Sequence, residues 1–422
     1  MAIRLLALFV LIPALASAQV DQAVRAQVQR EKQPLLDTLR DLVSIESGSG
    51  DVEGLARIGA LIAGRLRALG GEVEMVPPAA NMPRFTNTPP VLGDTVVARF
   101  RGRGTKRILL LAHMDTVYQR GMLAQQPFRI DGDRAYGLGI GDDKHGVAVI
   151  LHTLAVLKAA NFDGYGLITV LISPDEEIGS NAERELITTL GAEHDIVFSC
   201  EGTDRQDSVR LATSGVQIAV LSVKGRASHA GAAPDLGRNA LYEMAHQILQ
   251  MRDLSNPAKA VKVNWTLASA GSVSNAIPAD ARAFGDMRAD DERDFAGVEA
   301  TIRERIKNHL IPDTTVDVRF DRLYPPLPVR EQSVKAAEHA QRVYAEIGAT
   351  LKVNTVSTGG GTDAAFAALR TTAPVLEGMG LMNYGAHSND AEYIVIASIE
   401  PRLYLLTRMI MDAAAGKVAG MR

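Results

Sequence analysis

The chain has 422 residues, of which 46% are hydrophobic and 22% charged, and its formal net charge is −4. This length allows two domains, each with its own core. A slightly acidic chain argues against a nucleic-acid partner and against binding to a membrane surface through basic residues. The one cysteine, Cys200, cannot form an internal disulfide or a thiolate zinc site. Any bound metal must therefore be held by His, Asp and Glu.

The first 18 residues have the form of a secretory signal peptide. A positively charged end precedes an apolar run at 5–16, and Ala16-Ser17-Ala18 is a small-x-small cleavage pattern. A membrane anchor or a first buried helix is the alternative, but the run is shorter than the ~20 residues of a membrane span and Pro13 interrupts it. We expect cleavage after Ala18 and a secreted, periplasmic protein that has no membrane association after cleavage.

The mature chain begins with a helical pattern at 21–45 and a Pro- and Asn-rich loop at 77–90. Apolar segments typical of buried strands then alternate with helical patterns. The strands are predicted at 108–112, 167–172 and 195–199, and the helices at 144–160 and 181–190. This alternation predicts an α/β domain in which a mostly parallel sheet is covered by helices on both faces.

Residues 213–324 follow a different order. Strands are predicted at 216–223, 261–268, 281–287 and 315–320, and helices at 238–251 and 293–310. The order βαββαβ is typical of a small, ferredoxin-like sheet with two helices on one face. We therefore expect an inserted domain between two parts of a catalytic domain, 19–212 and 325–422. The second part contains predicted helices at 333–347 and 397–415.

Residues that can bind a metal follow three of the predicted strands. His113-Met114-Asp115 follows the first, Glu176-Glu177 the second and Glu201 the third. The carboxyl ends of parallel strands meet at one edge of a sheet, where open α/β sheets bind their ligands. Two more motifs are a Gly-rich turn that contains Asp142-Asp143 and a late loop that contains His387.

Each of these motifs has an ordinary explanation when it is taken alone, such as a surface histidine or a helix cap. Several carboxylates at one edge would nevertheless repel each other unless cations lay between them. Two imidazoles and three carboxylates suit zinc better than calcium or magnesium, and five ligands fit two zinc ions if one carboxylate bridges them. Such a pair predicts a metal-bound hydroxide as nucleophile, with Glu176 as the general base.

The sequence resembles the M20 zinc peptidases over nearly the whole mature chain, and among them the bacterial glutamate carboxypeptidases of the carboxypeptidase G type. Beyond the motifs above, the resemblance is carried by Ala227-Ser228-His229-Ala230-Gly231-Ala232-Ala233-Pro234, Ser274-Asn275 and Gly359-Gly360-Gly361-Thr362-Asp363. It implies a zinc-dependent metallocarboxypeptidase that cleaves the amide bond to the C-terminal amino acid of a small N-acyl amino acid or peptide.

The resemblance also implies two Zn²⁺ per subunit, with Asp142 as the bridging ligand. His113 and Glu201 would complete one site, and Glu177 and His387 would complete the other. Outside the metal shell, Asp115 would orient the imidazole of His113. The peptide bond between Asp142 and Asp143 would be cis.

The inserted domain would be a lid and the dimerisation domain of a homodimer. His229 would reach in from the partner subunit and polarise the scissile carbonyl. Substrate polar groups would be held by Asn275, Arg288 and the backbone N–H groups of Gly360 and Gly361. Arg288 is the expected clamp for a terminal carboxylate, because a guanidinium binds one through two hydrogen bonds.

The chain departs from the family pattern in three places. His145 stands where the family has glycine, and Ser208 and Tyr324 stand where the carboxypeptidase G type has basic side chains. The preference for glutamate is therefore open, although Arg210 and Arg322 lie close by in sequence and could compensate.

Three other functions compete with this prediction. An N-acyl-amino-acid amidohydrolase or dipeptidase of the same family would use the same chemistry on another leaving amino acid. A metal-binding scaffold without catalysis is disfavoured because Glu176 and Asp142 are both present. A serine hydrolase is disfavoured because no Gly-x-Ser-x-Gly elbow precedes a suitable helix.

Overall fold

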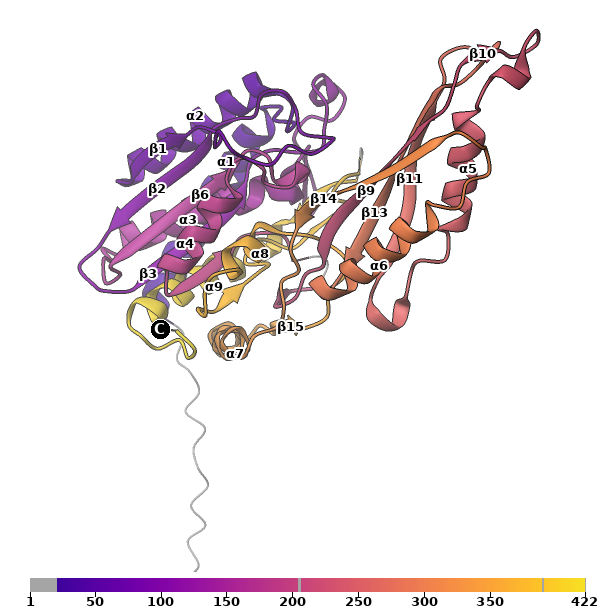
Figure 1. Cartoon of the computed structure of the whole chain (residues 1–422). Helices are drawn as coiled ribbons and strands as arrows, with labels where there is room; N and C mark the ends of the chain where they lie inside the picture. The colour runs from indigo at the N-terminus through magenta and orange to yellow at the C-terminus, as the bar shows by residue number, and fades with distance from the viewer. Residues whose placement is uncertain (1–20, 204–205, 389–390, 422) are drawn as a thin grey trace, which may run out of the picture.

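The structure is a computed structural model that describes residues 21–203, 206–388 and 391–421. The predicted signal peptide at 1–18 lies outside these residues. Figure 1 shows a catalytic domain built around one sheet and a second, elongated domain that extends away from it. Within the described ranges, no helix has both the length and the apolar character that a membrane span requires.

The catalytic domain contains a six-stranded sheet in the order β1-β2-β6-β3-β7-β16. In chain order, its strands are β1 (Glu72–Val76), β2 (Thr95–Arg101), β3 (Arg107–His113), β6 (Leu167–Ser173), β7 (Ile196–Ser199) and β16 (Val375–Leu376). β3 pairs in parallel with β6 and β7, and β7 pairs in parallel with β16, whereas β2 runs antiparallel to β1 and β6. The predicted, mostly parallel sheet is confirmed.

Helices cover both faces of this sheet. The helices of the catalytic domain are α1 (Gln22–Val43), α2 (Val52–Leu69), α3 (His145–Ala159), α4 (Arg184–Glu193), α7 (Glu331–Glu346), α8 (Asp363–Ala368) and α9 (Ile399–Ala414). In β3, Leu110 packs into the core formed with α1, α3 and α9, while Leu109 and Leu111 pack into the core formed with α4 and α8. The uninterrupted apolar run in β3 therefore follows from burial on both faces.

The second domain is an antiparallel sheet in the order β11-β13-β9-β14, with two helices. Its elements are β9 (Gly215–Lys224), α5 (Ala240–Gln250), β11 (Lys262–Ala270), β13 (Asp280–Ala289), α6 (Glu292–Arg305) and β14 (Thr315–Tyr324). This is the predicted βαββαβ order. α6 ends before the predicted residue 310, since the backbone N–H groups of Leu310 and Ile311 donate instead to buried Glu243 of α5, at 2.8 and 2.6 Å.

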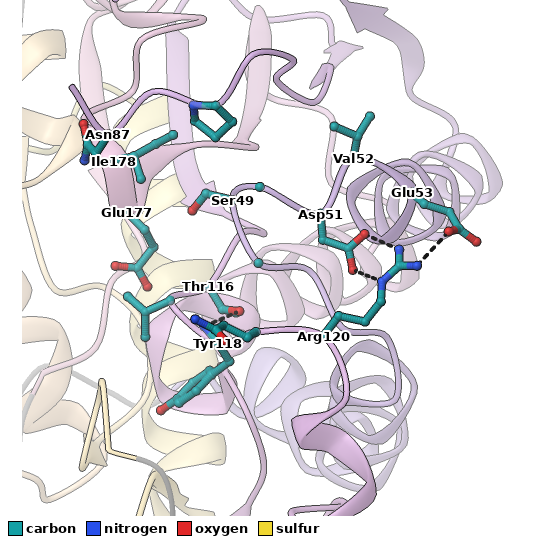
Figure 2. A pocket seen from close by; sticks show the side chains of 15 residues that line it. Ser49, Asp51, Val52, Glu53, Asn87, Thr116, Tyr118, Arg120, Glu177 and Ile178 are labelled. Carbon is teal, nitrogen blue, oxygen red and sulfur yellow. Dashed lines mark hydrogen bonds and ion pairs between the residues drawn. The ribbon is translucent and has the colours of Figure 1, made fainter. Parts of the chain in front are cut away.

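Shorter strands complete the fold. β10 (Ser228–His229) and β12 (Ala276–Ile277) pair at the far tip of the second domain (Figure 1), and β8 (Ser208–Arg210) pairs with β15 (Lys352–Asn354). A small sheet next to the main one contains β4 (Arg129–Asp131), β5 (Arg134–Tyr136), β17 (Asn383–Tyr384) and β18 (Tyr393–Val395). Arg120, in the loop after β3, forms ion pairs with two residues at the start of α2 (Figure 2). These are Asp51, the N-cap residue, and Glu53, in the first turn.

Candidate metal centre

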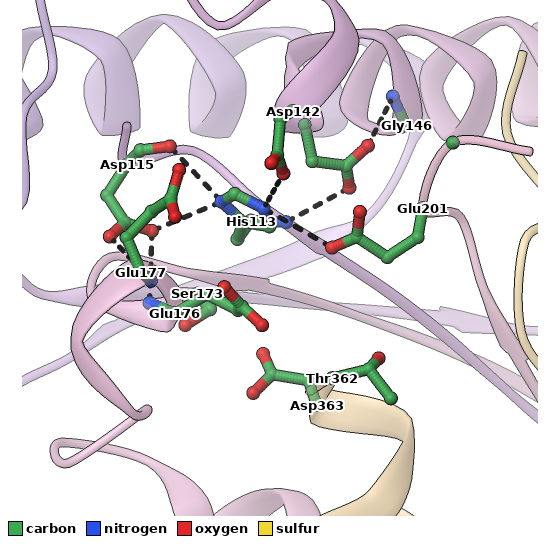
Figure 3. A network of polar contacts seen from close by, with 12 residues as sticks. His113, Asp115, Asp142, Gly146, Ser173, Glu176, Glu177, Glu201, Thr362 and Asp363 are labelled. Carbon is green, nitrogen blue, oxygen red and sulfur yellow. Dashed lines mark hydrogen bonds and ion pairs between the residues drawn. The ribbon is translucent and has the colours of Figure 1, made fainter. Parts of the chain in front are cut away.

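The predicted metal-binding residues gather at the carboxyl edge of the main sheet. Figure 3 shows His113, Asp142, Glu177 and Glu201 there. His113 is the last residue of β3, Glu177 lies in a single 3-10 turn just after β6, and Glu201 follows β7. Asp142 comes from the turn before α3, and His387 from the loop between β17 and β18. Parallel strands that end together thus bring residues from distant parts of the chain to one place.

Asp142 lies between two groups of possible metal ligands. Its Oδ1 is 2.9 Å from Nε2 of His113, which in turn is 3.2 Å from Oε1 of Glu201. Its Oδ2 is 3.2 Å from Nε2 of His387, which is 3.0 Å from Oε2 of Glu177. The ligand atoms of each group lie within 4.8 Å of one another.

Both groups fit a zinc ion. A tetrahedral zinc with bonds of about 2.0–2.1 Å holds its ligand atoms about 3.3 Å apart, close to the separations between these nitrogen and oxygen atoms. Imidazole with carboxylate is also a ligand set that zinc accepts. In addition, Oε1 of Glu177 is buried and has no hydrogen-bond partner among the described residues, so a cation would satisfy it.

The protonation behaviour of the centre also favours a cation. Burial raises the pKa of Glu177 to about 7, and Asp142 adds to this effect. Hydrogen bonds to Asp142 and Glu177 raise the pKa of His387 to about 10. Without a metal, the cluster would therefore hold extra protons around neutral pH. Metal binding would release them, since ligand carboxylates and imidazoles bind metal without their protons.

Asp115 is completely buried and contacts both His113 and the turn that carries Glu176 and Glu177. Its Oδ1 lies 3.2 Å from Nδ1 of His113, so that Nε2 of this histidine faces Asp142. The Asp115 carboxylate also accepts hydrogen bonds from the backbone N–H groups of Glu176 and Glu177, at 3.0 and 3.2 Å, and from the Ser49 hydroxyl at 2.6 Å. One carboxylate therefore orients a ligand histidine and the turn that carries the expected base.

Glu176 is half-buried next to the centre, and its carboxylate belongs to neither ligand group. Burial raises its pKa well above the usual range, and the neighbouring Asp363, Glu201 and Glu177 add to this effect. The Tyr324 hydroxyl donates to the backbone carbonyl of Glu176 and lies 3.0 Å from the Ser180 hydroxyl. Tyr324 thus supports the turn from the end of β14.

The Asp142 turn is held by a residue that sequence reasoning missed. Glu392 accepts hydrogen bonds from the backbone N–H groups of Gly139 and Gly141, at 3.1 and 2.7 Å, and from the Tyr118 hydroxyl. The peptide bond that follows Asp142 is cis, as the resemblance implied. Glu392 and Ser49 act through loops that are distant in sequence, and no local pattern marks them.

His145 is buried at the start of α3. Burial lowers its pKa to about 3, so the imidazole is neutral at physiological pH. Its Nδ1 lies 3.2 Å from Oδ1 of Asp143, and its ring lies close to Gly380 in the interior. The departure from the family glycine therefore adds a core residue and no charge that titrates near pH 7.

A cavity of about 280 Å³ lies between the metal centre and the antiparallel domain, and we call it the lid cavity. Its lining includes Glu176, Arg210, Arg288, Tyr324, Gly360 and Gly361. The Arg288 guanidinium donates to Asp286 at 2.8 Å and to the carbonyl of Gly359 at 3.1 Å, which fixes its plane and leaves a further N–H on each Nη atom.

The residues near the expected basic positions lie in different surroundings. Ser208 is buried in β8, where its hydroxyl donates to the carbonyl of Thr203 at 3.3 Å, and it does not line the lid cavity. Arg210 of the same strand does line it. Arg322 instead pairs with Glu299 of α6 at 3.1 Å. Of the two arginines named from the sequence, Arg210 is thus the one placed to meet a ligand in this cavity.

His229 and Asn275 lie together, away from the metal centre of their own chain. Both are at the tip of the second domain, where Figure 1 shows β10. The backbone N–H groups of Gly231 and Ala232 donate to Nδ1 of His229, at 3.1 and 3.0 Å. Nδ1 is therefore the unprotonated nitrogen, and an exposed Nε2–H is available as a donor. Neither residue lines the lid cavity.

A sheet whose carboxyl edge carries two candidate metal-binding groups that share the Asp142 carboxylate is typical of metal-dependent hydrolases. The chain belongs to Peptidase family M20/M25/M40, whose profile matches residues 109–412. It is a metallopeptidase of this family, which confirms the predicted family, fold class and enzyme class.

Known proteins resemble the chain over most of its length. Carboxypeptidase G2 from Pseudomonas sp. (strain RS-16) is 44% identical over 95% of each chain. Succinyl-diaminopimelate desuccinylase from Burkholderia multivorans is 29% identical over 74% of this chain and 85% of its own length. The crystal structure of a tripeptidase from Staphylococcus aureus matches with a TM-score of 0.74 and 21% identity, over 91% of this chain and 99% of that one, and it supports the fold alone.

Proposed function

We propose that this metallopeptidase is a two-zinc exopeptidase that releases the C-terminal amino acid from a small N-acyl amino acid or peptide. The observation that carries the proposal is the position of Asp142 between two His-and-carboxylate groups, with the uncommitted carboxylate of Glu176 beside them. Exopeptidase specificity is supported by the arginines of the lid cavity, which suit a terminal carboxylate. The similarity to carboxypeptidase G2 agrees with this proposal.

Two groups of residues would hold the two zinc ions. His113, Asp142 and Glu201 would hold one zinc, and Asp142, Glu177 and His387 the other. Bound zinc supplies Lewis acidity for the scissile carbonyl and for the attacking water.

Glu176 takes a proton from the water and passes it to the nitrogen of the leaving amino acid. Arg288 and Arg210 hold the carboxylate of that amino acid. The N–H groups of Gly360 and Gly361 would bind further polar groups of the substrate. Asn275 and His229 lie together at the tip of the second domain, so both would reach the substrate from the partner subunit, where Nε2 of His229 would donate to the oxyanion.

The released amino acid is the open part of the proposal. Glutamate is one candidate, by similarity to carboxypeptidase G2. Release of another amino acid, by an N-acyl-amino-acid amidohydrolase or dipeptidase, is the second candidate. It is favoured by Tyr324, a neutral residue in the lid cavity whose hydroxyl is already bonded to the turn of Glu176. A signal peptide at 1–18, a periplasmic location and a homodimer formed through the lid also remain parts of the proposal.

The test of specificity is hydrolysis of a panel of N-acyl amino acids that differ only in the C-terminal residue. We expect the free acids to be cleaved and their C-terminal amides to be poor substrates, because an amide has no negative charge and only one acceptor oxygen and so cannot form a bidentate ion pair with arginine. Arg288→Ala should raise KM for the free acids roughly 10- to 150-fold, the equivalent of about 1.5–3 kcal/mol. Arg293→Ala, on an exposed arginine of the same domain, is the control.

The same panel separates the outcomes. A preference for glutamate and aspartate over neutral residues identifies a glutamate carboxypeptidase, and the reverse identifies the amidohydrolase or dipeptidase. A chelator should abolish cleavage, and added zinc should restore it. Equal cleavage of the acids and amides, or activity that survives complete metal removal, would contradict the proposal.

Shared sites in a homodimer can be tested by mixing two inactive variants. Glu176→Gln and His229→Ala disable different parts of the site, so a mixed dimer contains one site that is intact on both sides. Random pairing in a symmetric dimer makes half of the dimers mixed, and we expect about a quarter of wild-type activity after co-expression. Activity no higher than that of the separate variants would show that His229 does not reach a partner's site.

A further inference from the structure

A second and larger cavity borders the metal centre and has no place in the proposed function so far. Its volume is about 760 Å³, within the range of roughly 300–1,000 Å³ that is usual for small-molecule sites. Glu177 is the one described residue that lines both this cavity and the lid cavity. Figure 2 shows Glu177 at one end of the cavity and the ion pairs of Arg120 at the other. The cavity therefore leads away from the metal centre, along a wall formed by the catalytic domain alone.

The chemistry of this wall differs from that of the lid cavity. Its apolar part consists of Val52, Pro89, Val117, Tyr118 and Ile178. Val52 and Val117 are exposed, at 37% and 42%, although both are aliphatic. The arginine in the wall, Arg120, is committed to carboxylates, because Nε donates to Asp51 at 2.9 Å and Nη1 to Glu53 at 2.9 Å. The wall therefore carries the two carboxylates of Asp51 and Glu53 against one guanidinium, and Glu177 adds a third carboxylate, so an anionic ligand would be repelled. Arg288 of the lid cavity, in contrast, pairs with a single carboxylate, that of Asp286.

We propose that this cavity holds the acyl group of the substrate and that it accepts an uncharged, mainly apolar acyl group; we call it the acyl cavity. The inference rests on the proposed function. An amide bond at the metal centre has two ends, and the arginines of the lid cavity suit the carboxylate end. The other end needs a space that begins at the same metal ligands, and the acyl cavity begins at Glu177.

The wall of the acyl cavity is bonded to the groups that position the centre. The Ser49 hydroxyl, in this wall, donates to Asp115 at 2.6 Å. The Tyr118 hydroxyl, which donates to Glu392, also lies 3.0 Å from the carbonyl oxygen of Ser388, next to His387. An acyl group packed against Ser49 and Tyr118 is therefore held at a fixed position relative to the metal ligands, and such positioning of a substrate raises the rate of reaction.

The chain offers a residue at which the cavity can be filled without backbone strain. Gly50 lies in the cavity wall, and a Cβ atom there would meet only Pro89, at 3.9 Å. Its φ lies outside the left-handed region, so a larger residue can adopt the same backbone. Gly64, on an exposed part of α2, has no atom within 4 Å of an added Cβ and gives a matched control.

The experiment compares Gly50→Phe and Gly64→Phe on two substrates with the same C-terminal residue, one N-acetylated and the other N-naphthoylated. We expect Gly50→Phe to reduce kcat/KM for the naphthoyl substrate roughly 10-fold or more, and that for the acetyl substrate by less than about 2-fold. Gly64→Phe should leave both unchanged. Val117→Asn makes the wall polar without filling the cavity. It should also lower kcat/KM for the naphthoyl substrate more than kcat/KM for the acetyl substrate.

Equal effects of Gly50→Phe on the two substrates would overturn the inference. Failure of the proposed function is a separate result, in which the wild-type protein cleaves neither substrate. In that case, binding of uncharged naphthamide, measured by its fluorescence, tests whether the acyl cavity is an apolar binding site. Binding to the wild type that Gly50→Phe removes and Gly64→Phe keeps supports an apolar site, and no binding to the wild type overturns it.

Discussion

Glu176→Gln is expected to lower kcat by about 10²- to 10⁴-fold, the contribution typical of a general acid–base group, while the protein keeps its full zinc content. Glutamine has nearly the same size and shape, but its amide cannot take a proton from water. The Glu176 carboxylate belongs to neither ligand group, so its replacement leaves both sets of metal ligands intact. The turn should also keep its position, because Asp115 holds it through the backbone N–H groups of Glu176 and Glu177.

The measurement pairs steady-state kinetics on the best substrate of the panel with the zinc content of the same sample. Glu185→Gln is the control, since Glu185 is an exposed carboxylate that pairs with Arg370 on the same domain. Turnover close to that of the wild type would remove Glu176 from the mechanism. Loss of zinc together with activity would make Glu176 a metal ligand and not the base.

The sequence predicted which residues the structure groups at the candidate metal centre, because most of them follow the ends of strands. Apolar runs such as Leu109-Leu110-Leu111 mark buried parallel strands, and the polar residue that ends each run must lie at the edge of the sheet. The grouping of His113, Glu177 and Glu201 therefore follows from the sequence pattern alone. The pairing of His387 with Asp142 came only from family resemblance, because a late loop carries no signal of where it folds back.

Other features depend on contacts that no local pattern records. Ser49 and Glu392 support the centre from loops far away in sequence, and each is an ordinary polar residue there. α2 and β1 were not predicted either. β1 is only partly buried and its sequence mixes glutamate with aliphatic residues, so it lacks the apolar run that marked the central strands. Whether Arg210 or Arg322 faces the lid cavity depends on the side-chain directions of two separate strands.

Asp142→Asn should cause the largest loss of metal, because this carboxylate contributes one oxygen to each ligand group. We expect a wild-type content of two zinc ions per chain and about one in either His113→Ala or His387→Ala, where only one group is damaged. Asp115→Asn should weaken zinc binding by only about 10- to 100-fold, because Asp115 acts through the imidazole of His113. Asp142→Asn should bind less zinc than any of these variants and have almost no activity.

Zinc titrations that follow thermal unfolding give an independent measure of the shared ligand. A ligand present at 100 times its Kd stabilises the folded state by about 2.7 kcal/mol, so zinc should raise the Tm of the wild type and a chelator should lower it. In Asp142→Asn the Tm should respond to neither, whereas each histidine variant should keep part of the response. The proposal of two zinc sites that share one carboxylate would be contradicted if Asp142→Asn retained two zinc ions. It would also be contradicted if His387→Ala lost both.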